Sequence, residues 1–344
     1  MKKRILSTII IIIIISGTVF AAESSTFWGA EGAVYIDDNK GYGIDGGFAP
    51  ISYIPKSDPG TYPLVSGDDG RDLGSGWGAV KALVYISHEI KLPYLQGSGS
   101  LTSGNNILYK FKGTFSPVSL NAIASATITP LAFLKFQAGS SIGTGWYAGF
   151  TNGLGLNADG TGTPAGDSFK GVVLESWISG TFQFDLGAVI PGDWTHVLLA
   201  ASSKLGYKRY TGAEKDQAWQ WQADAGENFN GFSYFGTYVL GYKLPYKVDT
   251  IAILVETEQM LFENKDRSTI TSGGWGSDFI KVTFSPLVNI KLSEDSSMKI
   301  LIQFTREKNY TVGTIFNNYF INRVYDGAYI DLQRIAFSYS MKIK

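Results

Sequence analysis

In the segment from Asp278 to Leu292 every even position from Ile280 onward is apolar, and most odd positions are polar. A period of two places one face of a strand against hydrocarbon or a core and the other face in water. At about 3.4 Å per residue this segment reaches about 50 Å, whereas strands of soluble proteins usually stop at about five or six residues. The pattern therefore predicts a bilayer-spanning strand, and such strands must close into a barrel because lipid offers unpaired backbone groups no partner.

Eleven other segments complete the expected wall, which makes the fold class all-β: a single closed antiparallel transmembrane barrel of about twelve strands, within a range of about ten to fourteen. The first strand and the break at Ser116-Pro117 carry the weakest patterns. We expect long loops at one end, beginning with Asp37–Ser75, and all short turns at the end that carries both termini. The eleven segments are Phe27–Ile36, Trp77–Leu92, Ile107–Phe115, Val118–Ile128, Ala132–Gly143, Val172–Leu186, Thr195–Tyr207, Phe232–Lys243, Val248–Leu261, Met298–Phe304 and Arg334–Ile343.

The first residues have the pattern of a secretory signal. Basic residues at positions 2–4 precede an apolar run over Ile9–Ile15, and Val19-Phe20-Ala21 places small residues at −3 and −1 of a cleavage site. We therefore predict a signal peptide at 1–21 and one barrel domain at 22–344. An uncleaved anchor helix is the alternative.

Composition supports a barrel and excludes several classes of function. Gly (41), Tyr (19), Phe (21) and Trp (8) are abundant, as many tight turns and aromatic belts require. No Cys occurs, which excludes disulfides, thiolate metal sites and a lipidated cysteine. Loss of the signal lowers the basic count from 29 to 26 against 30 acidic residues, so no cationic surplus points to nucleic acid.

The alternating last strand after a secretion signal resembles that of bacterial outer-membrane barrel proteins. The runs Ser116-Pro117-Val118-Ser119, Thr129–Leu134 and Gly143-Thr144-Gly145-Trp146 are similar to those of spirochaete outer-membrane proteins. The resemblance implies residence in the outer membrane, contact with its lipid and insertion by the barrel-assembly machinery. This chain departs from the usual aromatic last residue, since it ends Met341-Lys342-Ile343-Lys344.

The alternation along each strand also predicts which charged residues face the lumen; we call the set of alternate positions on one face of a strand its parity. Thirteen basic residues and five acidic ones fall on the inward side, an excess near +8 that favours anions. The alternative is that the lysines pair with loop carboxylates in a plugged barrel. The candidate selectivity residues are Lys81, Lys110, Lys112, Lys135, Glu175, Asp185, Lys204, Glu256, Lys281, Lys291, Lys299 and Arg334; Lys91, Lys208, Lys243, Lys342, Glu89 and Glu258 share their parity.

Other motifs favour structural roles. Gly41-x-Gly43-x-x-Gly46 has dinucleotide-binding spacing but no surrounding βαβ unit, and Asp68–Asp72 fits a solvated turn better than a Ca²⁺ site. His196 is expected to point inward, but no serine, including Ser202, can be paired with it. We therefore expect no enzyme, no cofactor and no metal. Trp219 and Trp221 fit the anchoring of their own loop better than sugar binding.

Three hypotheses of function remain. The first is a porin-like outer-membrane channel for passive diffusion of small polar or anionic solutes. The second is a closed barrel that serves as an adhesin or scaffold through its long loops. The third is a secreted soluble β-sandwich that binds carbohydrate.

Overall fold

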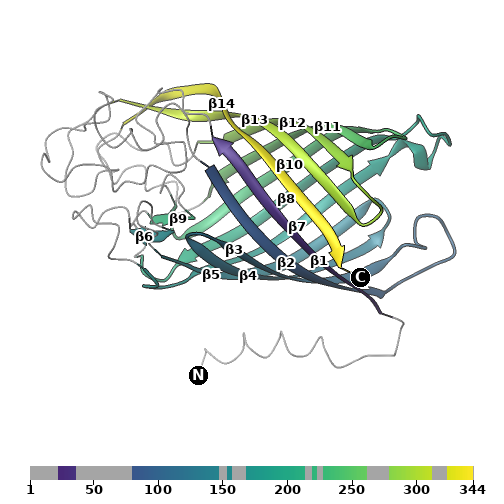
Figure 1. Ribbon diagram of the computed structural model, residues 1–344, viewed down its shortest axis with the longest axis horizontal. Helices are drawn as coiled ribbons and strands as arrows, with labels where there is room; N and C mark the ends of the chain where they lie inside the picture. Colours follow the sequence, from purple (N-terminus) through teal and green to yellow (C-terminus); the bar gives the residue numbers. More distant parts are fainter. Residues whose placement is uncertain are drawn as a thin grey trace, which may run out of the picture.

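A computed structural model describes residues 22–35, 80–146, 153–156, 168–213, 219–222, 228–261, 279–311 and 324–343. Within these ranges twelve strands form a closed antiparallel barrel, as the alternation predicts (Figure 1). Each strand pairs with its neighbours along the chain, and the first pairs with the last to close the wall. Closure excludes the β-sandwich. The barrel strands are β1 Glu23–Tyr35, β2 Val80–Pro93, β3 Asn106–Ser116, β4 Ser119–Leu131, β5 Leu134–Gly145, β7 Val173–Asp185, β8 Val197–Tyr210, β10 Gly231–Lys243, β11 Val248–Met260, β12 Lys281–Lys291, β13 Ser296–Thr311 and β14 Val324–Ile343.

The outer wall is apolar because one parity of each strand carries large hydrophobic side chains. Outward residues on opposite sides of the barrel include Ile86 of β2, Phe111 of β3 and Leu240 of β10, which are 57%, 50% and 53% exposed. Exposure of this extent over many strands is far above the scattered apolar residues of a soluble surface. The other parity faces the barrel interior and is largely polar.

One prediction about the turns is wrong. We call the end of the barrel where β1 begins and β14 ends the terminal end, and the opposite end the loop end. The tight turn at Pro117 and Val118 joins β3 to β4 at the loop end, because strand direction alternates from β1 onward. The Ser116 hydroxyl oxygen accepts from the Val118 backbone N–H at 3.3 Å, which stabilises the turn. The other ends are as expected: β10–β11 and β12–β13 are joined by short turns at the terminal end.

The last two strands are longer than predicted. β13 and β14 extend beyond the neighbouring strands at the loop end, where the pattern gave only Met298–Phe304 and Arg334–Ile343 (Figure 1). The register shifts between Gln303 and Phe304 and again between Lys308 and Tyr310. The first shift changes which side chains of β14 face inward, so strict alternation ends there although both strands continue.

Two short strands that the sequence did not predict form a small separate sheet at the loop end. β6 (Leu154–Leu156) pairs with β9 (Trp219–Trp221). Leu154 and Trp219 are fully buried and pack with Val173 and Tyr210, which lie at the loop ends of β7 and β8. The sheet is thus held against the inner rim of the barrel, which gives the two tryptophans the anchoring role favoured above.

Several predicted features lie outside the described residues. They include the signal peptide at 1–21, the glycine motif at Gly41–Gly46 and the acidic turn at Asp68–Asp72. No helix in the described ranges is long and apolar enough to cross a membrane.

Candidate functional site: the barrel lumen

The interior of the barrel holds a cavity of about 1000 Å³. Residues from every barrel strand except β1 line it, so it belongs to the whole wall. Among the described residues the lining includes six cations and three carboxylates, while most of the rest are Ser, Thr, Asn or Gln. The charged residues are Lys81, Lys91, Lys135, Lys204, Lys281, Arg334, Glu89, Glu256 and Glu258.

One side of the cavity is a row of polar side chains on successive strands, most of which carry a hydroxyl group. The strand registers place Lys135 of β5 beside Thr181 of β7, and continue through β8 to β13. The Thr181 hydroxyl donates to the Ser202 hydroxyl oxygen at 2.8 Å. The full row is Lys135, Thr181, Ser202, Thr237, Glu256, Thr283 and Thr305. Such a surface both donates and accepts hydrogen bonds, as a path for hydrated solutes requires.

The bulge in β14 lies beside a network of hydrogen-bonded side chains in this wall. It turns Gln333 and Arg334 to the lumen together, and both line the cavity. Arg334 Nε donates to Gln303 Oε1, and Gln303 Nε2 donates to Ser285 Oγ at 3.1 Å. Gln303 is 3% exposed and Ser285 is fully buried. The network fixes the guanidinium of Arg334 at the lumen surface, because each buried polar group has a partner.

Ion pairs neutralise several of the inward lysines that the alternation predicted. Lys110 Nζ lies 2.8 Å from Glu89 Oε1, and Lys204 Nζ lies 2.9 Å from Glu175 Oε1. Lys112 pairs with Glu31 at 3.1 Å. Glu31 was not predicted as an inward residue, because the weak pattern of the first strand did not show which of its positions face the lumen. It is an inward carboxylate on β1, and its effect is to leave a smaller net positive charge than the sequence indicated.

The remaining candidates lie at the terminal end, away from the cavity lining. Asp185 Oδ2 contacts His196 Nδ1 at 2.8 Å and accepts from the Gly187 backbone N–H at 2.9 Å. These contacts fix the connection that follows β7. Lys291 and Lys299 lie opposite Ser297 and Asn289 in the β12–β13 ladder, close to the turn between these strands.

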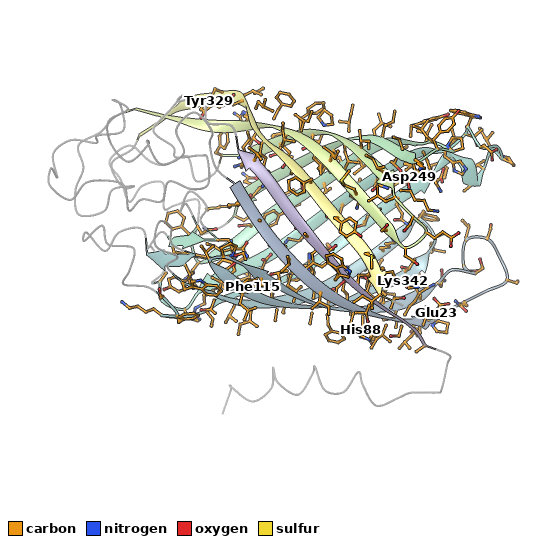
Figure 2. The ribbon with its side chains drawn as sticks, in the orientation of Figure 1. Glu23, His88, Phe115, Asp249, Tyr329 and Lys342 are labelled. Atoms are coloured by element: carbon orange, nitrogen blue, oxygen red, sulfur yellow. The ribbon has the colours of Figure 1, made fainter. Side chains whose placement is uncertain are left out.

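The two histidines show no hydrolase arrangement in the lumen. His196 contacts Asp185, whereas Ser202 bonds with Thr181. His88 faces outward near the terminal end (Figure 2), where its Nδ1 and Nε2 contact the Thr26 and Ser24 hydroxyls at 2.9 and 3.2 Å. These partners explain how an imidazole is accommodated on the apolar side of β2. The described residues contain no group of His, Asp and Glu arranged for a metal ion.

Comparison with known proteins finds barrels of low similarity. No family model and no curated protein sequence matches the chain. The β domain of the Bordetella autotransporter Brka is 10% identical over 93% of this chain and 100% of that chain, with a TM-score of 0.40. A Pseudomonas aeruginosa FadL homologue is 9% identical over 93% and 90%, with a TM-score of 0.32. The TodX monoaromatic hydrocarbon channel is 11% identical over 95% and 91%, with a TM-score of 0.29. No residue correspondence follows from likeness at this level.

Proposed function

We propose that this protein is an outer-membrane channel through which small solutes diffuse passively, with a preference for anions. The observation that carries the proposal is a polar, cation-rich cavity of about 1000 Å³ inside a closed barrel whose outer wall is apolar. A closed barrel satisfies its backbone hydrogen bonds internally, so it can span lipid and enclose water.

The distribution of aromatic residues supports a membrane position. At the terminal end Trp194 and Tyr246 pack edge to face with ring centroids 5.7 Å apart. At the loop end Trp146 stacks on Phe169 at 5.3 Å and lies 6.0 Å from Phe115. Aromatic side chains gather at the two interfaces of membrane barrels, with an apolar band between them.

The balance of charge in the cavity supports the preference for anions. Its lining carries six Lys or Arg side chains and three Glu side chains among the described residues. Charges of one sign in a narrow, partly low-dielectric passage raise the local concentration of the opposite ion. Lys204 and Lys91 have carboxylate partners, so the preference is expected to be modest.

Purified protein in a planar bilayer under a tenfold KCl gradient tests the proposal. We expect stepwise conductance and a reversal potential displaced towards the chloride equilibrium potential. The double variant Lys135→Gln and Lys281→Gln should move the reversal potential towards zero, because it removes two lumen cations without adding bulk. Absence of conductance, or selectivity for potassium in the unmodified protein, would contradict the proposal.

A further inference from the structure

Five successive strands lose their alternation at one place and become apolar on both faces. The five runs are Val197–Ala201 in β8, Tyr238–Leu240 in β10, Ile251–Val255 in β11, Pro286–Val288 in β12 and Ile300–Ile302 in β13. A continuous apolar run in a strand indicates that both of its faces meet apolar surroundings. The inside of a membrane barrel is normally polar, so the inward half of each run requires an explanation.

The strand registers bring these inward residues together. Leu301 of β13 lies opposite Leu287 of β12, and Leu287 lies opposite Ala252 of β11. Leu254, one pleat nearer the cavity, lies opposite Val239 of β10. We call the set Leu198, Ala200, Val239, Ala252, Leu254, Leu287 and Leu301 the inner apolar patch.

The patch faces the lumen and remains partly accessible. Its outward neighbours Leu240, Ile253 and Ile302 are 53%, 40% and 40% exposed on the outer wall, so the alternate positions point inward. Leu287 and Leu301 are neither fully buried nor fully exposed.

One cation lies beside the patch, and a second lies three strands further along the same row. The row that contains Leu301 continues through Ala336 of β14 and Ala33 of β1 to Lys81 of β2. Arg334 lies one pleat from Ala336 and is held by Gln303. Lys81 and Arg334 both line the polar cavity. The inner apolar patch therefore meets a charged edge inside the barrel, which carries Arg334 and Lys81 together with Glu256, the next inward residue after Leu254 on β11.

We infer that the lumen binds an amphiphilic anion, whose hydrocarbon chain lies on the inner apolar patch and whose carboxylate meets Arg334 and Lys81. This inference rests on the proposed channel and names the class of solute it selects. Arg offers a carboxylate a planar pair of donors, and each methylene on the patch loses contact with water.

Block of single-channel current by sodium alkanoates tests the inference in the full-length protein. We expect decanoate to block at a lower concentration than octanoate and hexanoate, by about threefold for each methylene, somewhat less than full burial gives. 1-Decanol and decyltrimethylammonium, which carry the same chain without an anion, should block more weakly than decanoate. Equal block by all three ten-carbon compounds would show an effect on the bilayer and overturn the inference.

A variant of the inner apolar patch and a matched control distinguish chain binding at the patch from effects elsewhere in the lumen. Leu287→Ser with Leu301→Ser should remove the dependence of block on chain length. Leu108→Ser changes another inward leucine, one that lines the cavity on β3, and should leave that dependence intact. If the double variant only raises conductance and keeps the dependence, the leucines narrow the bore without binding a chain, and the inference is wrong.

A variant at the proposed carboxylate site provides a second test, which can be used if the double leucine variant does not fold. Arg334→Gln should raise the half-blocking concentration of decanoate about tenfold while the dependence on chain length persists, because the patch is unchanged. An unchanged half-blocking concentration overturns the role of Arg334 as the anchor. If the unmodified protein conducts but all alkanoates block it equally, the inference is wrong and the proposed channel is unaffected. If the unmodified protein does not conduct, the proposed channel itself is wrong.

Discussion

At the scale of single residues, the lumen is governed by which charges have partners. Glu175 and Glu89 each neutralise a lysine of a neighbouring strand, whereas Arg334 donates to the amide of Gln303, which also donates to Glu256 at 3.5 Å. A paired lysine contributes little to the field along the axis. We therefore expect the proposed selectivity to depend on how each charge is partnered and not only on the number of inward lysines.

Substitution of Glu175 by Gln should strengthen the preference for anions. The change leaves Lys204 without its carboxylate partner at 2.9 Å and adds one unit of positive charge to the lumen. The reversal potential under a KCl gradient should move further towards that of chloride, and stability should change by less than about 1 kcal/mol because the pair is partly solvated. Asp193→Asn, which removes an exposed carboxylate from the connection between β7 and β8, is the control and should have a smaller effect. Equal shifts in both variants would contradict this assignment.

Substitution of Gln303 by Leu should destabilise the barrel by about 1–3 kcal/mol. The leucine has a similar volume but leaves Ser285 Oγ and Arg334 Nε without their amide partner in a buried position. Unfolding by urea in lipid vesicles measures the difference. Ser179→Ala, which removes a hydroxyl from the cavity lining, should stay within about 0.5 kcal/mol of the unmodified protein. A loss for Q303L no larger than that for S179A would show that the network contributes little.

At the scale of elements, alternation predicted the twelve barrel strands because lipid on one side and water on the other impose a period of two. Bulges ended that signal in β13 and β14, where Gln333 and Arg334 both turn inward. The side of the β3–β4 turn was predicted wrongly, because no local sequence feature reports it and only the direction of each strand, counted from β1, places it at the loop end. The pairing of β6 with β9 joins two loops far apart in sequence, and three-residue strands are too short to show a period.

Substitution of Trp219 by Ala should detach the small sheet from the rim while the barrel stays closed. Trp219 is fully buried against Leu154 and Tyr210, and loss of a buried tryptophan costs about 3–5 kcal/mol. We expect faster proteolysis within the loops after β5 and β8, together with a larger single-channel conductance. The variant should still migrate differently on a gel before and after heating, as a closed barrel does. Unchanged proteolysis and conductance would mean that the sheet does not depend on this cluster.

At the scale of the whole molecule, the barrel combines three surfaces. Its outer wall is apolar, its cavity is polar and carries more cations than carboxylates, and the terminal half of its lumen carries the inner apolar patch. The first two follow from the parity of the strands and could be predicted from the sequence. The third could not, because it requires the register that aligns five apolar runs from separate strands.

The central claim is that alternate residues of one wall face lipid and a water-filled lumen. The chain has no native Cys, so single cysteines can be placed at positions 202 to 205 of β8 and treated with a charged, membrane-impermeant thiol reagent in the native membrane. The account predicts rapid labelling at Ser202→Cys and Lys204→Cys and little at Ser203→Cys and Leu205→Cys. Labelling at all four positions, or the reverse pattern, would contradict it.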